Sequence, residues 1–188
     1  MCGFTGFLSR STPDVTALHA MGDSIIHRGP DEEGYYTDDH CAIAHRRLSI
    51  IDLAHGHQPM TSPDGRYILA YNGEVYNFQT LRTQLQELGH TFQTTSDTEV
   101  VLHGYMEWGA EVTGKLRGMF AFVIWDTQTK TLYGARDPFG IKPFHYAPMR
   151  DTFSSGSALN SLLTHPAFTT HLTRAPLQPS PHLPSPPL

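Results

Sequence analysis

The sequence predicts an α+β domain with largely antiparallel sheets. Strand-like segments lie towards both ends of the chain with helical segments between them, which is not the regular strand–helix alternation of a parallel sheet. Residues 119–126 and 131–136 form two strand-like runs separated by the polar residues 127–130, which predicts a buried hairpin. Hydrophobic periodicity alone does not define the order of the layers.

The N-terminal segments alternate between strand and helix patterns. Residues 3–9 predict a strand in which glycines allow close backbone approach. Thr12 is expected to cap a helix that has Pro13 in its first turn. That helix is expected to end near residues 27–30, where Gly and Pro both stop it. Its apolar face is Val15, Leu18, Met21 and Ile25, at helical spacing.

The next segments predict a turn, two strands and a loop. The turn is residues 28–31, and the strands are residues 34–37 and 41–45. Residues 45–52 are expected to run from strand into loop. Residues 54–65 contain Gly, Gln-Pro and Ser-Pro-Asp-Gly, so they are expected to be loop and turn.

A fourth strand, residues 67–71, is followed by Asn72-Gly73. An Asn-Gly pair usually predicts a hairpin, but a helical pattern follows it here. We therefore expect Asn72-Gly73 at a strand-to-helix junction, where backbone N–H groups are often presented to a ligand. The helical pattern consists of Phe78, Leu81, Leu85 and Leu88, closed by Gly89.

The remaining segments predict one long helix and several short elements. Ser96 and Glu99 have capping-box spacing, in which each side chain caps the other residue's backbone. Residues 137–143 predict a turn. The short elements expected after it are strands at 144–146 and 152–154, a helix at 157–163, and a Pro-rich tail from residue 166 that is disordered or polyproline-like. The tail is either an SH3-type ligand or a ragged end.

Composition excludes several classes of function. The chain has 188 residues, of which 16% are charged, and a net charge of -5, so it offers no basic surface for nucleic acid or membrane lipid. No apolar run reaches transmembrane length, and the N-terminus lacks the features of a signal peptide. Cys2 and Cys41 lack metal-ligand spacing, and a reducing cytoplasm is the simplest setting. His55 and His57 lack the partners of a metal site, so no metal is expected.

Met1-Cys2 would expose a nucleophile if Met1 were removed. Cys2 would then carry a thiol and a free α-amine, whose reference pKa of about 7.7–8 leaves it partly unprotonated at neutral pH. An N-terminal amine can serve as the base for its own side chain. A lone Met-Cys is usually chance, so further motifs must agree before the dipeptide indicates catalysis.

Seven motifs in order closely resemble the glutaminase domain of class II, N-terminal-nucleophile glutamine amidotransferases. Among these families the sequence looks most like glutamine-hydrolysing asparagine synthetases, over roughly residues 2–165. The motifs are Met1-Cys2-Gly3, Arg28-Gly29-Pro30-Asp31, Arg47-Leu48-Ser49-Ile50-Ile51, Asn72-Gly73-Glu74-Val75-Tyr76-Asn77, Ser96-Asp97-Thr98-Glu99, Arg117-Gly118-Met119-Phe120-Ala121-Phe122 and Ala135-Arg136-Asp137-Pro138-Phe139-Gly140-Ile141-Lys142-Pro143.

The resemblance implies a four-layer αββα fold and hydrolysis of glutamine to glutamate and ammonia. It assigns Cys2 as nucleophile and Asn72 with Gly73 as the oxyanion hole. Glutamine is a zwitterion, so its α-groups need one cation and one anion. Arg47 can hold the α-carboxylate as a planar fork, and Asp97 can hold the α-ammonium with help from Glu74. The resemblance also places backbone groups of Leu48, Ser49, Ile50 and Ile51 in the pocket.

The resemblance stops near residue 165. We expect a glutaminase domain at 1–165 and the Pro-rich tail at 166–188. The Ser-Gly-Gly-x-Asp-Ser loop of a synthetase domain has no counterpart, because residues 154–157 lack the second Gly and the Asp. No cofactor is therefore expected in this chain, since ATP and Mg would belong to the missing synthetase domain.

The expected product is ammonia for a synthetase domain acting in trans. A homodimer remains open, as do two other hypotheses: a non-catalytic glutamine-binding or regulatory module, and a non-functional truncated remnant.

Overall fold

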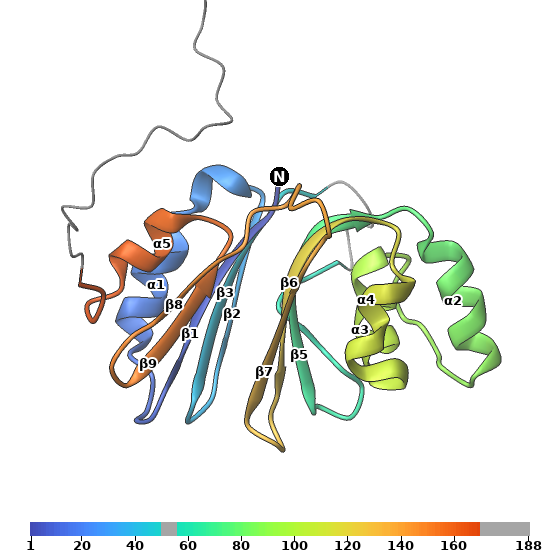
Figure 1. Ribbon diagram of the computed structural model, residues 1–188, viewed down its shortest axis with the longest axis horizontal. Coiled ribbons are helices and arrows are strands. Elements are labelled where there is room, and N and C mark those ends of the chain that lie inside the picture. Colours follow the sequence, from blue (N-terminus) through green and yellow to red (C-terminus); the bar gives the residue numbers. More distant parts are fainter. Residues whose placement is uncertain (50–55, 170–188) are drawn as a thin grey trace, which may run out of the picture.

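Two antiparallel sheets face each other, and helices cover their outer faces (Figure 1). This arrangement comes from a computed structural model that describes residues 1–49 and 56–169. It confirms the predicted α+β class and the αββα layers. Within the described residues, no helix has the length and apolar character needed to cross a membrane.

The first sheet joins segments from the two ends of the chain. Its strand order is β2-β3-β1-β9-β8, with every neighbouring pair antiparallel. All five strands match predicted strands to within a few residues. Their bounds are Glu32–Thr37 for β2, Cys41–Arg47 for β3, Gly3–Ser9 for β1, Thr152–Gly156 for β9 and His145–Pro148 for β8.

The second sheet has the order β4-β5-β6-β7. It contains β5 (Tyr67–Val75) and the predicted hairpin of β6 (Gly118–Asp126) and β7 (Thr131–Arg136). The short strand β4 (Met60–Thr61) pairs with β5 inside the segment predicted to be loop. The expected strand-to-helix junction at Asn72-Gly73 is wrong, because β6 extends far enough to pair with β5 as far as Val75.

The helices α1 (Val15–Asp23) and α5 (Leu159–Thr164) cover the first sheet. The predicted cap of α1 is wrong: Asp14 is the cap, and its carboxylate accepts hydrogen bonds from the backbone N–H groups of residues 16 and 17 at 2.8 and 3.3 Å. The helix also ends earlier than predicted, and a separate 3-10 turn, η1 (Ile26–Arg28), leads towards β2.

The helices α2 (Phe78–Glu87) and α3 (Asp97–Trp108) lie on the second sheet, followed by η2 (Gly109–Glu111) and α4 (Val112–Lys115). Ser96 caps α3 as predicted, by accepting from the Glu99 N–H at 3.3 Å. The Glu99 carboxylate does not complete the expected box. It binds the backbone N–H groups of Gln93 and Thr94 instead, at 2.8 Å each, and so fixes the loop before the helix.

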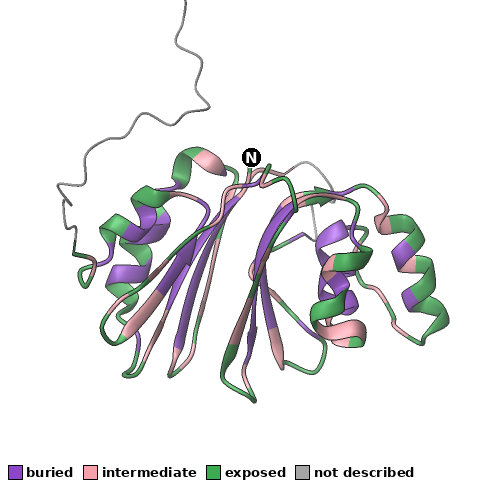
Figure 2. Cartoon of the chain, viewed as in Figure 1, coloured by how far each residue is buried: buried purple, intermediate pink, exposed green. Residues whose placement is uncertain are grey.

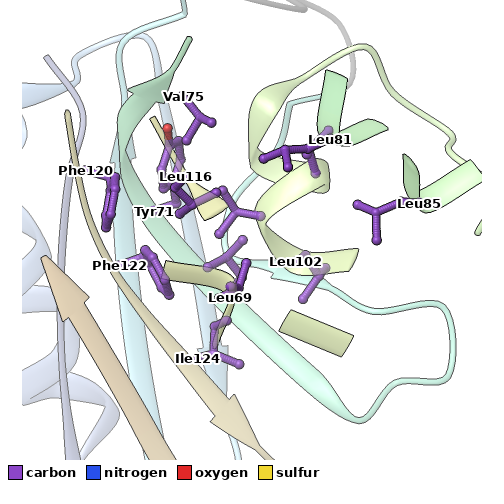
Figure 3. Close-up of a cluster of buried hydrophobic side chains, with 13 residues drawn as sticks. Leu69, Tyr71, Val75, Leu81, Leu85, Leu102, Leu116, Phe120, Phe122 and Ile124 are labelled. Atoms are coloured by element: carbon purple, nitrogen blue, oxygen red, sulfur yellow. The ribbon is translucent and has the colours of Figure 1, made fainter. Parts of the chain in front are cut away.

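Three apolar layers fill the spaces between these elements (Figure 2). Strand β6 contributes to two of these layers, because alternate side chains of a strand point to opposite faces. Phe120, Phe122 and Ile124 pack with α2 and α3 in the cluster of Figure 3. Ala121, Val123 and Trp125 pack between the sheets. Burial of both faces explains the continuous apolar run in an antiparallel strand.

Candidate active site

A cavity of about 380 Å³ opens where the N-terminal ends of β1 and β6 meet the C-terminal ends of β3 and β5. It brings together most of the predicted site residues. Those that line it are Cys2, Arg47, Leu48, Asn72, Gly73, Glu74 and Asp97. A larger hollow of about 510 Å³ lies at the opposite ends of β1 and β6 and contains none of these residues.

Cys2 immediately precedes β1 and is held by two separate segments. Its Sγ lies against the backbone of Leu48, with the thiol donating to the carbonyl oxygen at 3.4 Å and accepting from the N–H at 3.3 Å. Arg28 of η1 donates from Nε to the Cys2 carbonyl oxygen at 3.1 Å. A Cβ at Gly3 would lie 2.7 Å from the Arg28 side chain. Glycine at position 3 therefore lets Arg28 approach the N-terminus.

Asn72 and Gly73 lie in β5 opposite Ala121 and Phe120 of β6. The Asn72 side chain is 1% exposed, and its Nδ2 has no hydrogen-bond partner among the residues that the structure describes. An unpaired buried donor is costly, so its position on a cavity indicates a ligand. A Cβ at Gly73 would lie 2.6 Å from the Met119 carbonyl oxygen, so only glycine fits the closely packed sheet there.

Asp97 is the first residue of α3 and is held by β5. Its Oδ2 accepts from the Tyr71 hydroxyl at 2.7 Å and from the Val75 N–H at 3.0 Å. Burial raises the pKa of Asp97, while these hydrogen bonds oppose that rise. The capped start of α3 thus presents a buried carboxyl to the cavity.

Arg47 and Arg46 are both buried, but they belong to different faces of β3. Arg47 is 4% exposed, lines the cavity and donates from Nη1 to Glu32 at 2.9 Å. Arg46 is 6% exposed and binds Asp23 at 2.5 Å and Glu33 on the α1 side of the sheet. The alternation of the strand therefore separates two adjacent arginines, and only Arg47 reaches the cavity.

Only Leu48 and Ser49 of the predicted backbone segment 48–51 lie within the described residues. Leu48 lines the cavity and holds the Cys2 thiol. Ser49 is not among the lining residues, and its N–H donates to the Asp31 carboxylate at 2.8 Å. Ile50 and Ile51 lie outside the described residues. Glu74 lines the cavity near the end of β5, where it is exposed.

Three further residues were not predicted. Glu32 binds Arg47 and also His57. Burial raises the pKa of Glu32, but the hydrogen bonds and charges of these two groups outweigh burial, so the pKa is lowered. The β2–β3 register, which pairs Glu32 with Arg47, is the signal that could have revealed it. Gln58 accepts from the Tyr71 N–H at 2.7 Å, and Lys142 lines the cavity. Both come from loops whose placement depends on tertiary packing.

The cavity therefore carries a thiol, a free amide donor, a cation and an anion on separate rigid elements. Arg47 and Asp97 supply the two charges that an α-amino acid needs for recognition. No cluster of His, Cys, Asp or Glu in the described parts of the chain could hold a metal ion. His55, one of the two histidines weighed for such a site, lies outside those parts.

Comparison with known proteins gives consistent results. A family model described as a glutamine amidotransferase domain matches residues 1–181. The asparagine synthetase [glutamine-hydrolyzing] 1 of Bacillus subtilis is 46% identical over 168 residues, which are 87% of this chain and 27% of that protein. The asparagine synthetase [glutamine-hydrolyzing] 2 of Oryza sativa is 44% identical over 148 residues, covering 77% of this chain and 25% of that protein. The chain thus spans about a quarter of these relatives.

A solved structure shares the fold. The glutamine phosphoribosylpyrophosphate amidotransferase of Bacillus subtilis superposes with a TM-score of 0.72 at 24% sequence identity. The match covers 87% of this chain and 43% of that one.

Proposed function

Because the chain belongs to the glutamine amidotransferase domain family, we propose that it hydrolyses glutamine to glutamate and ammonia with Cys2 as the nucleophile. The observation that carries this proposal is the shared cavity. The Cys2 thiol opens into the same space as Arg47, Asp97 and the unpaired Asn72 amide.

Removal of Met1 is the first requirement of this proposal. Met1 itself lines the cavity, so its loss would enlarge the space for substrate and free the α-amine of Cys2. A neutral α-amine can accept the thiol proton and later deliver it to the leaving nitrogen. Retained Met1 would block both roles and favour the alternative of a non-catalytic glutamine-binding module.

The proposed reaction proceeds in two stages. Arg47 binds the α-carboxylate and Asp97 the α-ammonium, so the side-chain amide points at the thiol. The sulfur bonds to the amide carbon while the carbonyl π electrons move to oxygen, where Asn72 Nδ2 and the Gly73 N–H stabilise the charge. Ammonia leaves with the transferred proton. Water then attacks the thioester, which releases glutamate and restores the thiol.

We further propose a synthetase partner in trans, since the curated relatives are about four times as long as the matched region. Three large apolar side chains that are mostly open to solvent support a covered surface: Phe139 is 89% exposed, Tyr76 62% and Ile141 57%. Exposed apolar groups commonly mark an interface when they form a patch. Two free cysteines fit a reducing cytoplasm as the setting.

Sedimentation of the chain with a synthetase domain that lacks its own glutaminase part tests this partner. A one-to-one complex that Phe139→Ser abolishes would support it. Self-association lost in the same variant would support a homodimer instead, and a monomer in both mixtures would contradict both.

Glutamate and ammonia release from glutamine tests the catalytic proposal directly. Intact mass first establishes whether Met1 is absent. The mature chain should turn over glutamine, and Cys2→Ala should abolish turnover while still binding glutamine. Equal rates in the two proteins would refute Cys2 as the nucleophile. A folded mature chain that neither binds nor hydrolyses glutamine would favour the hypothesis of a non-functional truncated remnant.

A further inference from the structure

Lys142 is a largely buried lysine in the candidate active site. It follows β7 in the turn at residues 137–143, is 5% exposed and lines the same cavity as Cys2. Across residues 1–49 and 56–169, no hydrogen bond or ion pair is recorded for its Nζ. Nζ is not among the fully enclosed polar atoms that lack a partner, so it is accessible from the cavity, where a bound anion could pair with it.

The backbone of this turn holds Lys142 in place. The Asp137 carboxylate accepts from the N–H groups of Ile141 at 2.9 Å and Lys142 at 3.0 Å, and from Phe120 in β6 at 3.3 Å. Arg136 donates from Nε to the Lys142 carbonyl oxygen at 2.6 Å. The position of the lysine is therefore fixed relative to the start of β6, beside the cavity.

Lys142 lines the same cavity as Cys2, and charged groups around that cavity act on its ammonium. Burial lowers the pKa of Lys142 most, the Arg28 cation lowers it further, and Cys2, Glu74 and Asp137 oppose the change. Arg28 is itself bonded to the Cys2 carbonyl oxygen. Of the other charged groups in the cavity, Arg47 is paired with Glu32, and Asp97 accepts a hydrogen bond from Tyr71. Lys142 thus shares an environment with the thiol.

We propose that Lys142 is a specificity-determining residue that recognises negative charge at the γ-position of the bound amino acid. This inference rests on the proposed function. Glutamine is neutral at that position, whereas glutamate carries a γ-carboxylate and the tetrahedral adduct carries an oxyanion. A cation near Cys2 therefore favours the adduct over bound glutamine, which speeds the reaction, and it also favours the product, which slows release.

Equilibrium binding to the Cys2→Ala protein tests this selectivity. Lys142→Met should weaken glutamate binding roughly tenfold and glutamine binding less than about twofold, since only glutamate presents charge to the missing cation. Lys142→Arg keeps the charge and should retain most of the glutamate affinity. Equal weakening of both ligands by Lys142→Met, or no weakening of either, would overturn the proposal.

Alkylation of Cys2 provides a second test that does not require glutamine to bind. Anionic iodoacetate and neutral iodoacetamide attack the same thiol, and Cys41 is 1% exposed, so Cys2→Ala supplies the blank. The iodoacetate-to-iodoacetamide rate ratio should fall severalfold in Lys142→Met and persist in Lys142→Arg. An unchanged ratio would refute a cation at the thiol, whether or not the chain is a glutaminase.

The melting temperature separates this role from a structural one. Replacing an unpaired buried ammonium by a methionine of similar length should leave the melting temperature unchanged or raise it. A Lys142→Met chain that fails to fold would show that the lysine is structural and would overturn the proposal.

Discussion

Arg47→Ala should weaken glutamine binding far more than Arg46→Ala. The two residues are adjacent on β3, both carry a guanidinium and both are almost fully buried, at 4% and 6% exposure. Arg47 faces the cavity, whereas Arg46 binds Asp23 and Glu33 on the other side of the sheet. Arg46→Ala is therefore a matched control for the loss of a buried charge.

The magnitude follows from the contacts that a planar guanidinium can make. A hydrogen bond to a charged group contributes about 1.5–3 kcal/mol, and a carboxylate can accept two from one arginine. Loss of the pair should cost about 3 kcal/mol, which is roughly a 150-fold rise in the dissociation constant. Arg46→Ala should change it less than about threefold, because Arg46 does not line the cavity.

Isothermal titration of glutamine into both variants in a Cys2→Ala background is the assay, since this background prevents turnover. Circular dichroism must first show that both variants are folded, because each mutation removes a buried guanidinium from its ion pairs: Arg47 with the partly buried Glu32, and Arg46 with the exposed Asp23 and Glu33. Similar losses of affinity in the two folded variants would refute the assignment of Arg47 to the α-carboxylate and the orientation of β3 on which it depends.

Three further outcomes can be measured. Burial lowers the pKa of His45 to about 4, so protonation of His45 favours the unfolded chain. The free energy of unfolding should therefore fall by up to about 3 kcal/mol as the pH drops from about 6.5 to 4. Urea melts of His45→Gln should show a smaller fall over the same range. Gly73→Ala should lower the melting temperature and glutamine affinity together, because its Cβ would lie 2.6 Å from the Met119 carbonyl oxygen; an unchanged melt would contradict that packing. Hydrogen bonding by Arg66 lowers the pKa of Asp126, so Asp126→Asn should cost about 1–2 kcal/mol above pH 4 and little near pH 2; an equal cost at both pH values would contradict the ion pair.

Sequence patterns predicted most elements because each depends on local chemistry. The helix at residues 78–87 follows from apolar spacing closed by Gly89, whose φ of 100° suits glycine. Element ends were less predictable. The Asn72-Gly73 pair looks like a junction when only its neighbours are considered. Its place inside β5 depends on pairing with β6, which is more than forty residues away in the sequence.

The sequence by itself determined the family motifs, the α+β class and the residue types that one glutamine site requires. Tertiary structure decided which of those residues share a cavity. Only strand alternation and sheet packing separate Arg47 from Arg46, bring Glu32 beside Arg47, and carry Lys142 to the space that holds Cys2. The physical reason is distance along the chain: local propensity acts within a few residues, whereas the cavity is built by segments from residue 2 to residue 142 that meet only when both sheets bury their apolar faces.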